Sequence, residues 1–323
     1  MRVVILGAGA IGGVIGARLF QHGHDVTLIA RGENYTAISN NGLRLETPDE
    51  TVTLRAPVVD DPAALSYGAS DVVVVTVKSQ DTLGALGRLA QAAPDTTRIV
   101  CAQNGVENER VALRTFHNVY GICVMCPATH LTPGVVQANS SPVNGLLDVG
   151  RWPQGLDDLA EELASALSGA RFDSVARGDI ARWKWGKLLS NLGNAVEAVC
   201  GRSSRGGVLM ERVLAEGRLV LQTAGIEFVG PDEDDERRGQ LLTIGSIGGA
   251  ARGGGSSWQS LVRATGSIET DYLTGEIVLQ GRLHGVATPA NDLLQRLANQ
   301  LASERKAPGA WTVEEVEAML DAS

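Results

Sequence analysis

The chain has 323 residues, of which 44% are hydrophobic and 20% charged, and its formal net charge is −9. This composition is ordinary for a globular protein with room for two domains, and it excludes the disordered and collagen-like classes. The negative charge argues against a nucleic-acid surface, which needs clustered lysine and arginine. No apolar run approaches the roughly 20 residues of a membrane-spanning helix. We therefore expect a cytoplasmic protein that binds neither nucleic acid nor a membrane.

The first half of the sequence alternates strand and helix patterns. Near-continuous Val and Ile runs favour parallel strands buried on both faces, and these runs occupy residues 2–7, 25–31, 71–78 and 98–105. Amphipathic patterns between the strands predict helices at residues 10–21, 80–92 and 107–114. Residues 43–59 predict an inserted hairpin. After about residue 118 the strand patterns become shorter, and a helix at 156–168 closes this half.

Two of the four cysteines, Cys123 and Cys126, form a C-x-x-C pair inside the strand-like segment VYGICVMCPA. No second pair or suitably spaced histidine accompanies them, and no helix start lies there to lower a thiol pKa. Buried, small hydrophobic side chains are therefore the favoured interpretation, ahead of a redox or metal site. We expect no metal.

The second half contains no strong strand pattern after about residue 177. Helices are predicted at residues 179–200, 207–225, 256–283, 289–304 and 312–320. The acidic segment 231–238 indicates a solvated loop or a helix start, and the glycine-rich segment 245–257 indicates a flexible connection. We therefore place a domain boundary near residue 176, with an α/β domain over 1–176 and an all-α domain over 177–323.

A glycine-rich turn follows the first predicted strand. Gly7, Gly9 and Gly12 form G-x-G-x-x-G between that strand and the helix that begins near residue 10, with Ala8, Ala10 and Ile11 at the intervening positions. Glycines in this context permit a tight turn, let a pyrophosphate approach the N–H groups of a helix start, and allow close packing of helix on sheet. The motif predicts a Rossmann-type dinucleotide-binding domain.

The end of the second predicted strand indicates which dinucleotide is bound. An NAD-preferring site usually ends this strand with Asp or Glu, which accepts a hydrogen bond from the ribose hydroxyl. Here the strand ends in LIAR, so Ala30 and Arg31 occupy that corner. An arginine forms charge-assisted bonds with a 2′-phosphate, and this favours NADP. A surface arginine without a ligand is the alternative for Arg31.

Three polar residues share one stripe of the predicted helix RWKWGKLLSNLGNAVEAV. At about 100° per residue, Asn191 lies roughly 40° to one side of Lys187 and Asn194 roughly 20° to the other. A stripe that meets only water usually draws on Glu, Lys and Arg, whereas asparagine inside a helix tends to serve a specific hydrogen bond. The stripe is therefore a candidate ligand-binding face, with an ordinary solvated face as the alternative.

The order of five motifs resembles the ketopantoate reductase (2-dehydropantoate 2-reductase) family over roughly residues 1–305. The motifs are the glycine-rich start, VTVKSQDT, QNG, the helix with Lys187, and the late IETDYLTGE. The resemblance implies an N-terminal Rossmann-type domain that binds NADPH and a C-terminal helical domain that completes the site. It also implies reduction of 2-dehydropantoate to (R)-pantoate for pantothenate biosynthesis.

The resemblance assigns roles position by position. Lys78 resembles the family lysine beside the cofactor, and Asn104 the asparagine that meets the nicotinamide and the substrate. Lys187 matches the general acid and Glu269 the acidic residue near it. The implied substrate contacts are Asn104, Asn191, Asn194 and Ser257, of which Ser257 matches a serine that contacts the substrate carboxylate. Ordinary surface roles are the alternatives for Lys78 and Glu269.

The implied chemistry suits a lysine at position 187. Hydride delivery to a 2-keto carbon builds negative charge on the keto oxygen, so the site needs a proton donor and positive charge there. Lys187 supplies both, and Glu269 either orients it or accepts from a substrate hydroxyl. A small-molecule 2-keto acid is thus the expected partner, and a homodimer is left open.

Two departures concern substrate contacts. The family commonly carries asparagine eight residues after the lysine and three before the serine, where this chain has Ala195 and Gly254. Reduction of a 2-keto acid is therefore a firmer expectation than reduction of 2-dehydropantoate itself. A reductase of another 2-keto acid and a non-catalytic NADP-binding sensor are the alternatives. A hydroxyacid dehydrogenase is less favoured, because the five histidines show no clear His/Asp pair.

Overall fold

The computed structural model describes residues 1–322, which form two compact units. The first unit contains Met1–Lys184 and Pro231–Arg252, and the second contains Trp185–Gly230 and the chain from Gly253 onward. The chain therefore passes between the units three times, whereas the sequence patterns suggested one boundary near residue 176. That boundary falls inside the first unit.

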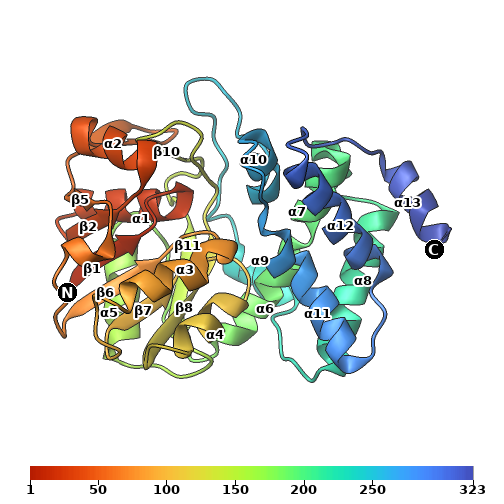
Figure 1. Cartoon of the computed structure of the whole chain (residues 1–323), viewed down its shortest axis with the longest axis horizontal. Coiled ribbons are helices and arrows are strands. Elements are labelled where there is room, and N and C mark those ends of the chain that lie inside the picture. The colour runs from red at the N-terminus through yellow and green to blue at the C-terminus, as the bar shows by residue number, and fades with distance from the viewer. Residues whose placement is uncertain (323) are drawn as a thin grey trace. The chain divides into compact units, whose positions relative to one another are not determined.

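A seven-stranded sheet forms the centre of the first unit (Figure 1), in the order β11-β8-β7-β6-β1-β2-β5. All neighbouring strands are parallel except β11, which runs antiparallel to β8. The strands are β1 (Arg2–Leu6), β2 (Asp25–Ile29), β5 (Val58–Val59), β6 (Asp71–Val75), β7 (Arg98–Cys101), β8 (Asn118–Met125) and β11 (Leu146–Arg151). The expected parallel α/β fold is confirmed.

Both faces of this sheet are buried, which explains the unbroken Val and Ile runs. Val3 and Ile5 of β1 belong to one hydrophobic cluster and Val4 and Leu6 to the other, as alternate side chains point to opposite faces. On the first face lie α1 (Ala10–Gln21) and α5 (Asp158–Gly169), and on the second lie α3 (Ser79–Leu89) and α4 (Glu107–Leu113). The helix expected at residues 10–21 has the predicted bounds.

A smaller sheet packs on the α1 side, with strand order β4-β3-β10-β9. Its strands are β3 (Leu43–Glu46), β4 (Thr51–Leu54), β9 (Ala128–Thr129) and β10 (Val135–Ala138). The predicted hairpin is the antiparallel pair β3 and β4. A short 3₁₀ turn, η1, covers Pro62–Ala64. The sequence analysis did not predict the helix α2 (Gly32–Asn41), whose only buried residue is Ile38 and whose pattern is therefore hardly amphipathic.

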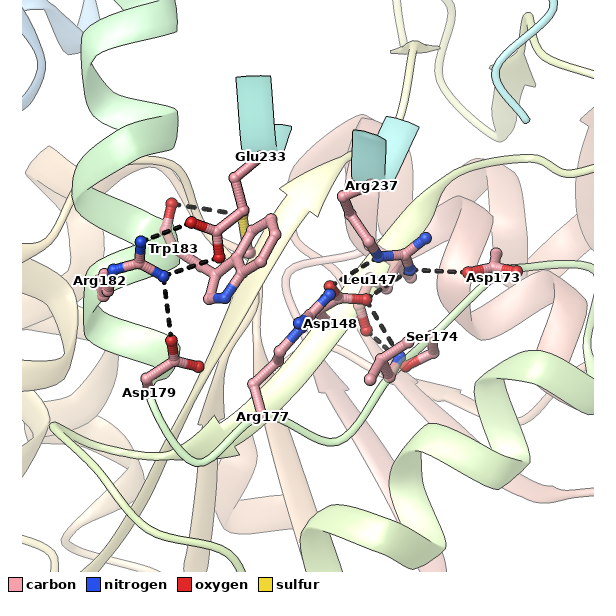
Figure 2. Close-up of polar contacts among 12 residues, drawn as sticks. Leu147, Asp148, Asp173, Ser174, Arg177, Asp179, Arg182, Trp183, Glu233 and Arg237 are labelled. Carbon is pink, nitrogen blue, oxygen red and sulfur yellow. Dashed lines mark hydrogen bonds and ion pairs between the residues drawn. The ribbon is translucent and has the colours of Figure 1, made fainter. Parts of the chain in front are cut away.

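The segment 231–252 returns to the first unit through ion pairs (Figure 2). It begins with α9 (Pro231–Arg238), so the acidic segment is a helix. Glu233 of α9 pairs with Arg182, at 2.8 and 2.5 Å for its two carboxylate oxygens. Arg237 donates to both oxygens of the buried Asp148, at 2.6 and 2.9 Å, and also pairs with Asp173. These long-range contacts place α9 on the first unit although the chain leaves that unit beforehand.

The second unit is helical. It contains the end of α6 (Ile180–Asn191) and the helices α7 (Gly193–Cys200), α8 (Val208–Thr223), α10 (Ser256–Val262), α11 (Thr274–His284), α12 (Pro289–Ser303) and α13 (Val313–Asp321). Two 3₁₀ turns, η2 (Arg202–Ser204) and η3 (Glu269–Tyr272), complete it. Leucine and valine side chains from α6, α7, α8, α11 and α12 form its buried interior.

Two helices predicted as continuous are divided. The helix expected at 179–200 breaks into α6 and α7 at Leu192, which keeps helical dihedral angles but lies in a tightened turn with i→i+3 hydrogen bonds. The helix expected at 256–283 is broken between α10 and η3, where Ala264 and Gly266 adopt positive φ angles of 50° and 87°. A left-handed residue ends a helix. Sequence periodicity did not reveal either break.

No helix within residues 1–322 has both the length and the apolar character that crossing a membrane requires.

Candidate active site

The glycine-rich turn lies between β1 and α1, as its sequence predicts. Gly7 has a φ of +110°, and a Cβ added there would lie 2.8 Å from Cγ1 of Val77. A Cβ at Gly12 would overlap Thr76 Oγ1 and the carbonyl oxygen of Gly7, and would lie 2.8 Å from Cγ2 of Ile5. Both positions therefore exclude a side chain, because the turn is left-handed at one and α1 approaches the sheet at the other.

The middle glycine of the motif has a different environment. A Cβ at Gly9 would meet nothing within 4 Å, so the space beside the start of α1 is open. Unpaired N–H groups at a helix start attract anions, and an open glycine there lets a phosphate approach the backbone. This geometry fits the pyrophosphate of a dinucleotide.

A polar contact that sequence reasoning missed braces this turn. Asn34 of α2 donates from Nδ2 to the carbonyl oxygen of Ala8 at 2.8 Å, and its Oδ1 accepts from the backbone N–H of Gly134 at 2.8 Å. Asn34 thus links the glycine-rich turn to the segment before β10. Asn34 lies in α2, a helix that the sequence analysis did not predict, and no local pattern indicated that its side chain braces the turn.

Arg31 lies at the corner that distinguishes the two dinucleotides. It follows β2 and caps α2, and its side chain is exposed, whereas Ala30 before it is buried. Within residues 1–322, no hydrogen bond or ion pair engages its guanidinium. A ligand phosphate would therefore not have to displace an internal partner of this group.

A buried network of side chains holds the loops after β6 and β7. Gln103 donates from Nε2 to the carbonyl oxygen of Val77 at 2.7 Å and to Thr82 Oγ1 at 2.8 Å. Asn108 donates from Nδ2 to the carbonyl oxygen of Asn104 at 3.0 Å and to Ser79 Oγ at 3.1 Å. These bonds fix the backbone on either side of the predicted site residues Lys78 and Asn104. The network brings these two strand ends together, at the edge where open α/β sheets bind ligands.

A buried ion pair lies beside this network. Lys184, the fifth residue of α6, is 2% exposed, and its Nζ donates to the carbonyl oxygen of Gln103 at 2.9 Å and to Glu109 Oε1. Glu109 is fully buried, and burial raises its pKa although the ammonium of Lys184 opposes the shift. Gly121 of β8 leaves room for the pair, since a Cβ there would lie 3.1 Å from Glu109 Oε1. The pair ties the start of α6 to the loop that carries Asn104.

The predicted stripe in the second unit is partly formed. Lys187 Nζ donates to Asn191 Oδ1 at 2.6 Å and to Ser190 Oγ at 3.2 Å. Asn191 is buried, so its carbonyl oxygen fixes the ammonium at the surface of α6. This pair agrees with the i, i+4 spacing read from the sequence.

Asn194 has a different partner. Its Oδ1 accepts from Arg205 Nη2, and its Nδ2 donates to Ser256 Oγ at 3.5 Å. The tightened turn at Leu192 separates it from the regular helical course of Lys187 and Asn191. Ser257 follows directly in α10 and is buried. The structure thus links Asn194 to the start of α10 and to Arg205, a residue that the sequence analysis did not single out.

Glu269 is buried at the start of η3 in the second unit. Its charge acts on Arg263, whose pKa burial lowers and Glu269 raises, with burial the larger effect. A buried carboxylate in a helical unit is not the ordinary surface residue considered as an alternative for this position.

The cysteines are free thiols in this structure. Cys126 donates to the carbonyl oxygen of Asn144 at 3.4 Å, and burial raises its pKa to about 12. Cys123 is buried in β8 and contacts the carbonyl oxygen of Trp183. A thiol with a raised pKa is a poor nucleophile. The interpretation of this pair as buried, small side chains is therefore favoured.

Comparisons with known proteins agree with this architecture. The family model described as "Ketopantoate reductase PanE/ApbA" matches residues 3–154, and its C-terminal counterpart matches residues 179–302. The 2-dehydropantoate 2-reductase of Archaeoglobus fulgidus is 30% identical over 312 residues, which cover 94% of this chain and 98% of that protein. The enzyme of the same name from Pyrococcus horikoshii is 28% identical, with 92% and 96% covered.

Solved structures show the same similarity. A PanE/ApbA family ketopantoate reductase from Ralstonia eutropha superposes with a TM-score of 0.79 at 28% identity, covering 94% of this chain and 99% of that one. A D-mandelate dehydrogenase with bound NADH and anilino(oxo)acetate gives a TM-score of 0.81 at 24% identity, with 94% and 99% covered. The second likeness shows the fold alone.

The glycine-rich turn on a parallel sheet is a dinucleotide-binding arrangement, and the family models and curated relatives place the chain among the nicotinamide-dependent oxidoreductases. Together, the two family models match most of its length. The chain belongs to the ketopantoate reductase PanE/ApbA family, and NADPH is the cofactor of that family.

Proposed function

We propose that this protein reduces a 2-keto acid with NADPH, and that the substrate is 2-dehydropantoate, which becomes (R)-pantoate in pantothenate biosynthesis. The observation that carries the proposal is the bond from Lys187 to the buried Asn191, in a chain that also has the dinucleotide turn of this family. Curated relatives named 2-dehydropantoate 2-reductase support the choice of substrate. A cytoplasmic location is part of the proposal.

The first unit is proposed to hold the cofactor. The turn from Gly7 to Gly12 would hold the pyrophosphate, Arg31 the 2′-phosphate, and Lys78 and Asn104 the nicotinamide end. When bound, NADPH supplies a hydride to the keto carbon. The buried network of Gln103 and Asn108 keeps the loops of Lys78 and Asn104 in one arrangement, so little reorganisation accompanies binding.

The second unit is proposed to hold the substrate and supply the proton. The ammonium of Lys187 stabilises negative charge as it develops on the keto oxygen and then donates a proton to it. Asn191 orients this ammonium through the 2.6 Å bond. Asn194 and Ser257 are proposed substrate contacts, and Glu269 is proposed to act on Lys187 or on a substrate hydroxyl.

The test is a panel of 2-keto acids that includes 2-dehydropantoate, with oxidation of NADPH followed by absorbance. Turnover with 2-dehydropantoate at the highest kcat/KM is the expected result. Higher kcat/KM for another member would assign a different 2-keto acid. Tight NADPH binding without turnover of any member would overturn the reductase function and favour the NADP-binding sensor.

Arg31 provides a prediction about cofactor choice. Replacing it with alanine is expected to weaken NADPH binding by about 10- to 100-fold, because a charge-assisted bond to the 2′-phosphate is worth about 1.5–3 kcal/mol. Binding of NADH should change little, since NADH has no phosphate there. Titrating both cofactors by fluorescence checks this. Equal losses for NADPH and NADH would remove Arg31 from the 2′-phosphate site.

Assembly of the chain is a separate proposal. A ketopantoate reductase from Staphylococcus aureus, described as dimeric, superposes with a TM-score of 0.70 at 22% identity, which is a likeness of fold alone. We propose a homodimer, and sedimentation equilibrium of the purified protein measures its mass directly.

A further inference from the structure

A cluster of three polar side chains lies in the second unit, close to the proposed substrate residues. It consists of Asn194, Glu197 and Arg205, and we refer to it as the Arg205 cluster. Glu197 is buried, and its Oε2 accepts from Arg205 Nε at 2.8 Å and from Nη2 at 2.6 Å. Both of its oxygens also accept from the backbone N–H of Gly255, at 3.2 and 3.1 Å. The carboxylate thereby fixes both the guanidinium and the turn before α10.

The guanidinium of Arg205 is held along one edge only. Its Nε and Nη2 donate to Glu197, and Nη2 also donates to Asn194 Oδ1. Within residues 1–322, Nη1 has no hydrogen-bond acceptor, and the side chain as a whole is 44% exposed. An arginine fixed in this way keeps the N–H groups of Nη1 for an anion, and it needs no reorganisation to bind one.

The space around this guanidinium excludes other side chains. A Cβ at Gly255 would lie 2.6 Å from Nη2, and a Cβ at Gly254 would lie 2.6 Å from Glu197 Oε1. Gly193, next to Nη1, also lacks a side chain, and a Cβ there would lie 3.8 Å from that nitrogen. A larger residue at position 254 would therefore meet Glu197 of the Arg205 cluster and also the ring of Trp258, which would lie 2.5 Å from the added Cβ.

The Arg205 cluster lies near the proposed proton donor. Asn194 follows Asn191 by three residues across the tightened turn at Leu192, a rise of about 4.5 to 6 Å along the chain. Asn191 accepts from Lys187 Nζ. In a 2-keto acid the carboxylate is bonded directly to the keto carbon. When the keto oxygen of the substrate meets Lys187, the carboxylate of the same substrate therefore lies only a few bond lengths away. That spacing is comparable with the length of one helical turn, which is the separation of Asn191 and Asn194 along the chain.

We propose that Arg205 binds the carboxylate of the 2-keto acid whose keto oxygen meets Lys187. The inference rests on the proposed reductase function and adds a substrate-binding residue to it. Arg205 forms a charge-assisted bond with the carboxylate, while Glu197 and Asn194 hold the guanidinium in place. The site thus selects acids over uncharged keto compounds.

Binding of oxamate, an unreactive analogue of a 2-keto acid, tests this without turnover. Calorimetry on the NADPH-saturated protein compares oxamate with its neutral counterpart oxamide, in wild type and in the variants Arg205→Gln and Arg205→Lys. Both variants are expected to weaken oxamate binding by about 10- to 100-fold, with oxamide and NADPH affinities unchanged. The lysine variant keeps a cation beside the buried Glu197, so a loss of oxamate binding in this variant is not explained by an unpaired buried carboxylate that prevents folding. Arg218→Gln, an exposed arginine of α8, is the matched control.

Several outcomes decide the matter. Wild-type affinity for oxamate in Arg205→Lys, or equal losses for oxamate and oxamide, overturns the assignment. The assignment is also overturned if the Arg205 variants lose turnover only with 2-keto dicarboxylic acids, because the guanidinium would then hold the second carboxylate, distant from the keto group. Preference for oxamate in wild type that disappears in both variants, without turnover of any keto acid, would sustain the carboxylate site and reject the reductase function.

Discussion

Replacing Lys187 with alanine is expected to lower kcat by about 10²- to 10⁴-fold, the usual contribution of a positioned general acid. The affinity for NADPH should change little, because the proposed cofactor residues all lie in the first unit. The loss falls on kcat rather than on binding, since the ammonium acts on charge that appears only as the keto group is reduced. Steady-state kinetics with 2-dehydropantoate and a fluorescence titration of NADPH measure the two quantities.

The matched control for this experiment is Lys306→Ala. Lys306 is exposed and pairs with Glu304 at the surface, so its removal should leave both kcat and NADPH affinity unchanged. A turnover number for Lys187→Ala close to that of wild type would eliminate Lys187 as the proton donor.

The second large effect is expected from the buried ion pair of the first unit. Replacing Lys184 with methionine leaves the fully buried Glu109 without its cation, and the carbonyl oxygen of Gln103 loses a donor. Breaking one partner of a buried pair costs about 3–5 kcal/mol of unfolding free energy. Urea denaturation of wild type and variant measures the difference.

A double variant separates the ion pair from simple packing. Changing Glu109 to leucine together with Lys184→Met removes both charges, and most of the lost stability should return, because apolar pairs often replace buried ion pairs at little cost. Lys306→Met is the surface control, with an expected change within about 1 kcal/mol. A single Lys184→Met variant as stable as wild type would show that the pair contributes nothing to the fold.

The sequence predicted the parallel strands β1, β2, β6 and β7, the hairpin of β3 and β4, and most helices of the first unit, because their signals are local. Val3 to Leu6 show a continuous apolar run, and the glycines at 7, 9 and 12 mark where the strand gives way to α1. These features require no knowledge of distant residues. The predicted family and the Rossmann-type fold followed from them and are confirmed.

Features that depend on residues far apart in the chain were not predicted. The return of α9 to the first unit depends on Arg237 and Asp148, which are separated by 89 positions. The break after α10 depends on the positive φ of Ala264, a residue type with no local preference for that conformation. Periodicity carries no information about either.

In the candidate site, too, contacts between residues close in the sequence were predicted and contacts between distant residues were not. The pairing of Lys187 with Asn191 follows from helical spacing, which local sequence contains. Asn194 was placed on the same stripe, but its carbonyl oxygen is taken by Arg205 from beyond the end of α7. The environment of Gly254 likewise depends on Glu197, which is 57 residues earlier in the chain by its number and adjacent only in the fold.

The most direct test of the account follows the hydride itself. The protein is incubated with 2-dehydropantoate and NADPH that carries deuterium at both C4 positions of the nicotinamide, and the product is analysed by mass spectrometry. The account predicts pantoate with one deuterium at C2. Pantoate without the label, or labelled NADPH left unconsumed, would contradict it.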